Sequence, residues 1–158
     1  MKEFLWPVRV YYEDTDNGGV VYYANYLKFM ERARTEWLRA MGVEQDNLIE
    51  QEGVIFAVRS IEVDYLKPAR FNQLLNVSVE LIRPGKASFT FRQKVTLAPT
   101  NTTGAGNSTQ MQTTGRDNTL LCEGCVKIAC LDVNTLRPMP IPAALGLASN
   151  GLAGSAAK

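Results

Sequence analysis

The sequence predicts an α+β fold in which an antiparallel β-sheet wraps around one long central helix. One strongly amphipathic segment, roughly 24–41, indicates the helix. Several later segments alternate apolar and polar residues, which is typical of strands with one buried face. Because these strands follow one another without intervening helices, the pattern favours an antiparallel sheet. The apolar strand faces need a cover, and the helix is the only large candidate in the sequence.

The length and composition are those of one ordinary globular domain. The 158 residues suit a single domain that spans 1–158, and 46% of them are hydrophobic against 21% charged. The net charge of +1 excludes a broad basic surface for nucleic acid. Residues 1–7 lack the apolar core of a signal peptide, and no apolar run reaches membrane-spanning length. A cytoplasmic location is therefore expected.

The N-terminal part predicts a strand, a turn and the central helix. The strand is expected at 8–12, and a dense cluster of turn residues follows at 14–19. The helix then runs to Gly42, a usual stop signal. Its apolar positions recur at a spacing of three and four and should face the sheet: Tyr26, Phe29, Met30, Ala33, Trp37, Ala40 and Met41.

The middle of the chain predicts a long strand and a hairpin. Residues 54–65 are apolar at alternate and adjacent positions, so much of both faces of this strand is expected to be covered. Residues 75–81 and 89–97 should pair as an antiparallel hairpin. Pro84 and Gly85 between them predict a type II turn in which Gly85 has a positive φ.

The C-terminal part predicts a loop, a last strand and a tail. The composition changes to Thr, Gly, Asn, Ser and Gln over 99–118, which predicts a flexible insertion loop between two paired strands. The last strand is expected at 120–133. Three prolines then end regular structure, and 143–158 are expected to form a short or frayed tail.

The residue types that are present restrict the chemistry. The chain has no histidine, which excludes Ser-His-Asp and Cys-His catalysis and any histidine-ligated metal. In the last expected strand, alternation places Cys122 and Cys130 on one face and Cys125 on the other. No fourth ligand stands nearby, so reduced cysteines of a half-buried strand are favoured over a zinc site. Neither a metal nor a cofactor is expected.

The segment 11–26 concentrates residues that suit chemistry on a carbonyl group. Asp14 and Asp16 lie in a turn. Gly18 and Gly19 allow the backbone to approach a ligand closely, and a helix then begins with unpaired N–H groups. Attack on a thioester carbonyl pushes negative charge onto its oxygen, and one aimed N–H can contribute about 2.7–4 kcal/mol to the rate. A nearby carboxylate can attack directly or activate water.

The residues of this segment also suit other roles. Asp14 and Asp16 are equally suited to be turn and capping residues. A calcium-binding loop would begin well, but its twelfth place holds Asn25 where such a loop needs Glu. The glycine pair lacks the spacing of a dinucleotide-binding or phosphate-binding loop.

The stretch from Val8 to Leu38 resembles a known family. It contains the block Asp-x-Asp-x-x-Gly-x-Val-x-Tyr at 14–23, followed by Met-Glu-Arg-Ala-Arg-Thr-Glu-Trp-Leu on the expected helix. On these residues the chain resembles the 4-hydroxybenzoyl-CoA thioesterase family of hotdog proteins, in particular its Tol–Pal-associated acyl-CoA thioesterase branch. The similarity continues more loosely through 65–70, the later strands and Asp132. It covers nearly the whole chain except the insertion and the tail.

The resemblance implies a hotdog-fold acyl-CoA thioesterase, with a five- or six-stranded antiparallel sheet wrapped around the helix. It implies dimers with sites at the subunit interface, and often homotetramers. It implies that Asp16 is the catalytic carboxylate, as nucleophile or general base, and that the backbone N–H of Tyr23 polarises the thioester carbonyl. Tyr23 stands where the branch usually has His. If only the backbone matters, this changes little; if that His assists catalysis, this protein is slower or prefers other acyl groups.

The CoA-binding residues are predicted from the charge of the ligand. CoA carries phosphates, so Lys or Arg side chains should lie at the rim of the site. Arg70, Lys86 and Ser88 are the predicted contacts, with Gly18 and Gly19 beside the catalytic carboxylate.

The sequence allows alternatives for one residue, for the function and for the substrate. Glu31 is a further carboxylate on the helix, where a solvated or interface ion pair is the simpler role. The chain could instead be a non-catalytic partner that binds an acyl carrier protein through the thioester pocket. Within enzymes, nothing in the sequence separates an acyl-chain substrate from an aromatic-CoA substrate.

Overall fold

The computed structural model describes residues 3–99 and 118–145, which form one sheet and its covering helices. The antiparallel sheet has the strand order β1-β3-β4-β5-β2. Its strands are β1 (Phe4–Arg9), β2 (Val54–Tyr65), β3 (Leu74–Pro84), β4 (Ser88–Leu97) and β5 (Leu120–Asp132). The helices are α1 (Asn25–Ala40) and α2 (Gln45–Glu52), with short 3-10 turns η1 (Tyr12–Asp14) and η2 (Ala143–Leu145).

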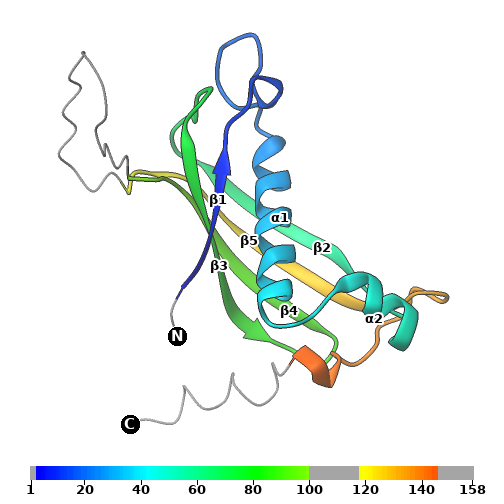
Figure 1. Ribbon diagram of the computed structural model, residues 1–158. Helices are drawn as coiled ribbons and strands as arrows, with labels where there is room; N and C mark the ends of the chain where they lie inside the picture. The colour runs from blue at the N-terminus through cyan, green and yellow to red at the C-terminus, as the bar shows by residue number, and fades with distance from the viewer. Residues whose placement is uncertain (1–2, 100–117, 146–158) are drawn as a thin grey trace.

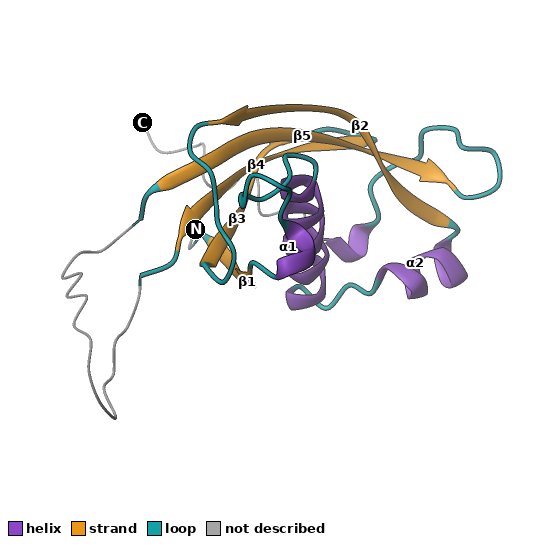
Figure 2. Cartoon of the chain, turned by 90° about the horizontal axis from the view of Figure 1, so that it is seen from above, coloured by secondary structure: helices purple, strands orange, loops and turns teal. Residues whose placement is uncertain are grey.

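The central helix lies across one face of the sheet, as the sequence predicts. Figure 1 shows α1 in front of the strands, and Figure 2 shows the sheet curving over it. The buried face of α1 consists of Tyr26, Phe29, Met30, Ala33, Arg34 and Leu38. The prediction was wrong for Ala40 and Met41, which are exposed. The chain turns away at Gly42, which has a φ of +83°, and Val43 returns to the core instead.

The first strand begins earlier than the sequence predicts. It spans 4–9 instead of 8–12, and the chain continues into a 3-10 turn at Tyr12–Asp14. Pro7 argues against a central strand, but β1 is an edge strand that pairs only with β3. A proline is tolerated there because an edge strand needs its N–H groups on one side only.

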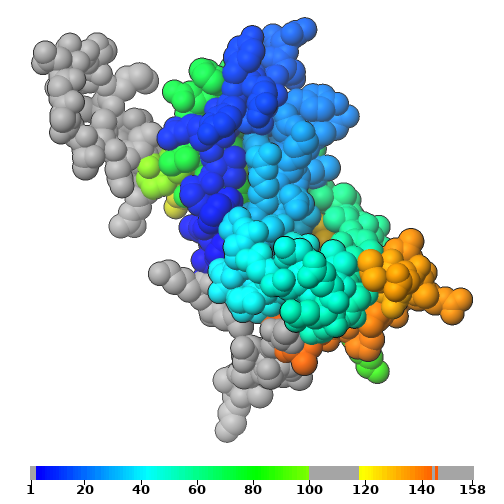
Figure 3. Space-filling view, turned by 45° about the vertical axis from the view of Figure 1, so that its right-hand side comes forward, coloured from blue at the N-terminus to red at the C-terminus, as the bar shows by residue number. Residues whose placement is uncertain are grey.

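The helix α2 was not predicted. It contributes one buried residue, Leu48, so its sequence has little amphipathic signal. Gly53 ends it with a φ of +64°. Figure 3 shows the surface of α2 next to the segment that follows β5, where the N–H of Val133 donates to the carbonyl of Gly53 at 2.8 Å.

The long strand β2 has the predicted bounds but not the predicted burial. It forms the edge of the sheet and pairs only with β5 among the described residues. Val58 is 53% exposed and Tyr65 46% exposed. The apolar run was expected to be covered on both faces, whereas in the single chain one edge and much of its surface remain open.

The hairpin of β3 and β4 is confirmed, but its predicted turn type is wrong. Gly85 is not among the described glycines with a positive φ. Its N–H donates to the carbonyl of Ser88 at 2.7 Å, and an added Cβ would lie 2.7 Å from that same oxygen. Glycine is therefore required here by the close approach of two backbone segments rather than by a left-handed conformation.

The last strand β5 confirms the predicted alternation of cysteines. Cys122 and Cys130 are fully buried and Cys125 is half-buried, and all three are free thiols. Burial raises the pKa of the Cys122 thiol to about 12, which makes it unreactive. Cys122 and Cys130 belong to the core.

Most of the predicted insertion loop and tail lies outside the described residues. The residues that flank the predicted loop are hydrogen-bonded to each other: the N–H of Leu97 donates to the carbonyl of Thr119 at 3.0 Å. At the start of the predicted tail, Leu145 is fully buried, so the core reaches into that segment. No helix within 3–99 and 118–145 is long and apolar enough to cross a membrane.

Candidate functional site

A loop closed by backbone hydrogen bonds places the acidic block of residues 14–16 near the start of α1. The N–H of Asp16 donates to the carbonyl of Val20 at 2.9 Å, and the N–H of Tyr22 donates to that of Asp14 at 3.0 Å. Between them Thr15 and Val21 form an antiparallel bridge. This small hairpin closes the loop, so residues 14–16 and the first residues before the helix lie at the same end of the molecule (Figure 1).

The structure separates the roles of the two aspartates. Asp14 is a capping residue, because its Oδ2 accepts the N–H of Tyr11 at 2.8 Å and its carbonyl accepts the side-chain amide of Asn25 at 2.8 Å. Asp16 is exposed, and its Oδ1 accepts only the N–H of Gly18, at 2.8 Å, among the described residues. The carboxylate of Asp16 is therefore oriented by one hydrogen bond and leaves its second oxygen to solvent or a substrate.

Tyr23 lies where the backbone enters α1. Its side chain is 61% exposed. In the part of the chain that the structure describes, its backbone N–H has no hydrogen-bond acceptor. Such an N–H at the start of a helix is a donor available to a developing oxyanion. The predicted role of the Tyr23 amide requires such an unoccupied donor, and that role stays a prediction.

Tyr65, at the end of β2, contacts Tyr23 and was not predicted from the sequence as a site residue. Its hydroxyl donates to the carbonyl of Tyr23 at 3.0 Å. The two rings pack edge to face with centroids 6.2 Å apart, and Tyr65 also packs against Tyr26 at 5.6 Å. Partial burial raises the pKa of Tyr65 above the ordinary tyrosine value. Only the tertiary structure pairs residues 42 positions apart in the sequence.

The two glycines of the loop shape the turn around Asp16. The N–H of Gly18 bonds to the carboxylate, and the N–H of Gly19 donates to the carbonyl of Asp16 at 3.0 Å. Gly19 has a φ of +74°, a conformation that glycine adopts without strain. Their amides are therefore engaged within the turn, which positions the carboxylate.

The predicted CoA-binding residues fall at two different ends of the sheet. Arg70 is exposed and forms a bridge with Val20, so it lies beside the loop of Asp16. Lys86 and Ser88 follow β3, which starts near Arg70 and runs away from it. A strand of this length spans roughly 35 Å. A single chain therefore does not bring Lys86 and Ser88 to Asp16 (Figure 1).

Glu31 lies on α1, eight residues after Tyr23, and so outside the loop of Asp16. It is exposed, and its Oε1 accepts the hydroxyl of Thr35 at 3.1 Å. This is an ordinary hydrogen bond between helix neighbours four residues apart. The described residues contain no group of three or more His, Cys, Asp or Glu side chains that could hold a metal ion.

Known proteins resemble this chain over nearly its full length. "Acyl-CoA thioesterase YbgC" from Haemophilus influenzae is 37% identical over 139 residues, which cover 88% of each chain. "Acyl-CoA thioester hydrolase YbgC" from Escherichia coli O6:H1 is 40% identical over 139 residues, covering 88% of this chain and 90% of that protein.

Solved structures share the fold. A probable thioesterase from Bartonella henselae has a TM-score of 0.73 at 29% identity, over 89% of this chain and 100% of that one. A 1,4-dihydroxy-2-naphthoyl-CoA thioesterase from Synechocystis has a TM-score of 0.75 at 19% identity, over 93% and 95%. The expected hotdog fold is thereby confirmed. The family model described as the thioesterase-like superfamily matches residues 10–148, and the chain belongs to that family.

Proposed function

We propose that this protein hydrolyses acyl-CoA thioesters to a free acid and CoA, with Asp16 as the catalytic carboxylate and the N–H of Tyr23 as the oxyanion donor. The observation that carries the assignment is their arrangement: an exposed, oriented carboxylate on a loop tied to a helix start with an available amide. Relatives at 37% and 40% identity are named as acyl-CoA thioesterases. The absence of histidine leaves a carboxylate as the natural acid–base group.

The proposed reaction balances without any further group. In the general-base form, Asp16 takes a proton from water as the water oxygen adds to the thioester carbonyl carbon, and the amide of Tyr23 stabilises the oxyanion. The C–S bond then breaks, and the CoA thiolate leaves with a proton. In the nucleophilic form, the carboxylate itself adds to the carbonyl, the C–S bond breaks with release of the CoA thiolate, and water hydrolyses the resulting anhydride. In a single turnover in water labelled with heavy oxygen, label in Asp16 identifies the nucleophilic form, because it enters only when water attacks the aspartyl carbon of the anhydride.

The activity is tested with a panel of acyl-CoA substrates and detection of the released thiol. The panel includes short and long aliphatic acyl groups and aromatic acyl groups. We expect the rate of thiol release to depend on which acyl group the substrate carries. Binding of acyl groups without thiol release would favour the non-catalytic alternative, in which the chain binds an acyl carrier protein. The replacement of the usual His by Tyr23 is the observation that keeps this alternative under test.

A second copy of the chain is proposed to complete the site. β2 is an edge strand with exposed apolar side chains, an arrangement that normally pairs with another strand or is protected from it. Two copies paired antiparallel along β2 about a two-fold axis run in opposite directions. The end of the second sheet that carries Lys86 and Ser88 would then approach Asp16 of the first. The two residues stay candidates for CoA binding on this basis.

Changing Val58 to lysine should disrupt that pairing. Val58 is 53% exposed on β2, and a charge on an edge strand opposes strand addition. We expect Val58→Lys to shift the protein from dimer or tetramer to monomer in sedimentation or light-scattering measurements. The matched control is Ile49→Lys on α2, where an exposed apolar residue is replaced at 42% exposure. If both variants keep the native mass, β2 is not the interface.

Changing Gly18 to alanine should misplace the carboxylate of Asp16. A Cβ at Gly18 would lie 3.1 Å from Oδ1 of Asp16, so the carboxylate must move by a few tenths of an ångström. Because a misplacement of about 1 Å can cost roughly 100-fold, we expect Gly18→Ala to lower kcat by about tenfold with an unchanged melting temperature. Asn17→Ala, next to it on the exposed turn, is the control and should retain activity.

The cytoplasmic location expected from the sequence stays a prediction.

A further inference from the structure

A cavity separate from the loop of Asp16 lies between the second half of α1 and the sheet. Its volume is about 110 Å³. Its walls are apolar side chains of β2, β4 and β5, among them Phe56, Phe89 and Phe91. Arg34 enters it from α1, 11 residues after Tyr23. That separation is roughly 16 Å along the helix, so the cavity is not part of the candidate catalytic loop.

Arg34 is a buried cation whose hydrogen-bond partner among the described residues is neutral. Its exposed fraction is 9%, and its Nη1 donates to Oε1 of Gln93 at 2.8 Å. No carboxylate of the described residues lies within 4.0 Å of its guanidinium. Buried charges are rare in proteins unless they are paired. Burial lowers the pKa of Arg34, the direction expected for a cation with incomplete compensation.

Gln93 fixes the guanidinium in place. Its side-chain amide donates to the carbonyls of Met30 at 3.0 Å and Ser78 at 3.3 Å, which sets Oε1 toward Arg34. Every fully buried side-chain nitrogen or oxygen of the described residues has a hydrogen-bond partner. The guanidinium nitrogens of Arg34 that have no hydrogen-bond partner among the described residues are therefore not fully enclosed, and Arg34 lines the cavity. An arginine held in this way presents a preorganised pair of N–H groups.

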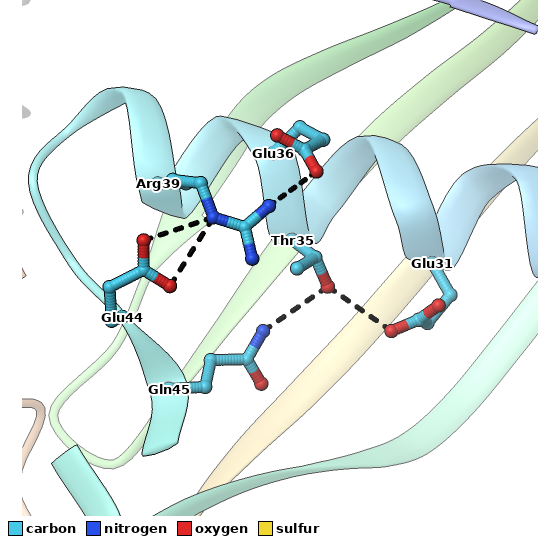
Figure 4. A network of polar contacts seen from close by, with 6 residues as sticks. All are labelled: Glu31, Thr35, Glu36, Arg39, Glu44 and Gln45. Atoms are coloured by element: carbon cyan, nitrogen blue, oxygen red, sulfur yellow. Dashed lines mark hydrogen bonds and ion pairs between the residues drawn. The ribbon is translucent and has the colours of Figure 1, made fainter. Parts of the chain in front are cut away.

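The nearby acids are engaged elsewhere. Figure 4 shows Thr35 between Glu31 and Gln45: it donates to Glu31 at 3.1 Å and accepts from Gln45 at 3.2 Å. All three residues line the cavity. Glu36 and Glu44 both pair with Arg39 on the surface. Glu31 is the only acidic residue that lines the cavity, and it attracts Arg34 through space without an ion pair.

We infer that this cavity binds a carboxylate carried on a short apolar body, with the guanidinium of Arg34 receiving the carboxylate and the phenylalanine rings covering the body. Planar guanidinium groups match carboxylates with two parallel hydrogen bonds. Such a ligand would supply the negative charge that Arg34 lacks in the chain. The site does not depend on the proposed hydrolysis. The ligand is a free acid, because a short acyl group whose thioester lies at Tyr23 would not span the roughly 16 Å to Arg34.

The first test compares acids with their amides on the intact protein. Benzoate and hexanoate should bind saturably in isothermal titration calorimetry, while benzamide and hexanamide, of the same shape, should bind at least about tenfold more weakly. This ratio follows from the ~1.5–3 kcal/mol of a hydrogen bond to a charged group. Acids and amides that bind equally, or no saturable binding of either acid up to tens of millimolar, would overturn the inference.

Variants of the two charged residues give opposite expected shifts. Arg34→Met should weaken acid binding to the level of the amide, because a similar volume remains without the charge. Glu31→Gln should strengthen acid binding severalfold, because it removes the only acid that lines the cavity. If Arg34→Met does not fold, the wild-type acid–amide comparison and Glu31→Gln still decide. Acid binding that survives in folded Arg34→Met would contradict the site.

Thiol release tests whether the cavity is separate from the catalytic loop. Succinyl-CoA and adipyl-CoA are compared with butyryl-CoA and hexanoyl-CoA in the wild type and in Arg34→Met. Unchanged KM values together with lost benzoate binding are the expected result for a site that takes a free acid. A rise in KM confined to the carboxylated substrates would contradict the separation of the cavity from the catalytic loop. Binding measured without turnover would leave this site standing while the proposed hydrolysis fails.

Discussion

Asp16→Asn should lower kcat by about 10²–10⁴-fold, the range over which a positioned acid–base group contributes. The asparagine keeps an Oδ1 that can accept the N–H of Gly18, so the turn should form as it does around the aspartate. What it loses is the negative charge needed to attack a carbonyl or to take a proton from water. The measurement is thiol release from an acyl-CoA substrate, together with the melting temperature.

The matched control for this prediction is Asp14→Asn. Asp14 lies two residues earlier and caps the N–H of Tyr11 through Oδ2, a contact that concerns the fold of the loop. Its replacement should cost stability before it costs turnover. If Asp14→Asn and Asp16→Asn lose activity equally, or if Asp16→Asn turns over normally, then Asp16 is not the catalytic carboxylate and the family assignment alone remains.

Phe91→Ala should destabilise the protein by about 3–5 kcal/mol, as large-to-small substitutions of buried aromatic residues do. Phe91 is 1% exposed and packs edge to face against Trp37 of α1 at 5.0 Å and Phe89 at 5.2 Å. It therefore joins the helix to the middle of the sheet. Removing its ring leaves a void that these rigid neighbours cannot close. Chemical denaturation measures the change in the free energy of unfolding.

An exposed phenylalanine provides the comparison for Phe91. Phe71 is 55% exposed and its ring meets only Tyr12 among the aromatic pairs of the described chain. Phe71→Ala should change the free energy of unfolding by less than about 1 kcal/mol. Equal losses in the two variants would mean that α1 is not held to the sheet through the Phe91 contact.

The local periodicity of the sequence was enough to predict the helix and most strands. α1 and β2 begin and end within a residue or so of their predicted bounds, because each is a window with its own spacing of apolar residues. The short helix α2 buries a single residue and so leaves almost no such spacing to detect. β1 was displaced because Pro7 is acceptable only on an edge, and strand order is not written in any local window.

The candidate site was also only partly predictable from the sequence. Asp16, Gly18, Gly19 and Tyr23 lie within eight residues, so their motif can be recognised in the sequence. Tyr65 reaches Tyr23 only because β2 returns along the helix. Lys86 and Ser88 were predicted beside Asp16 on charge and turn position, but the direction of β3 carries them to the far end of the sheet.

By itself the sequence determined the family, the helix that covers the sheet, and the exclusion of histidine chemistry, because all three depend on residue identity and short spacing. Only the tertiary structure decided which charges are buried. Arg34 reads as one more polar residue of an amphipathic helix, yet folding places it 9% exposed beside Gln93 of β4, 59 positions away. The burial of a residue depends on what the rest of the chain packs against it, and that is a long-range property.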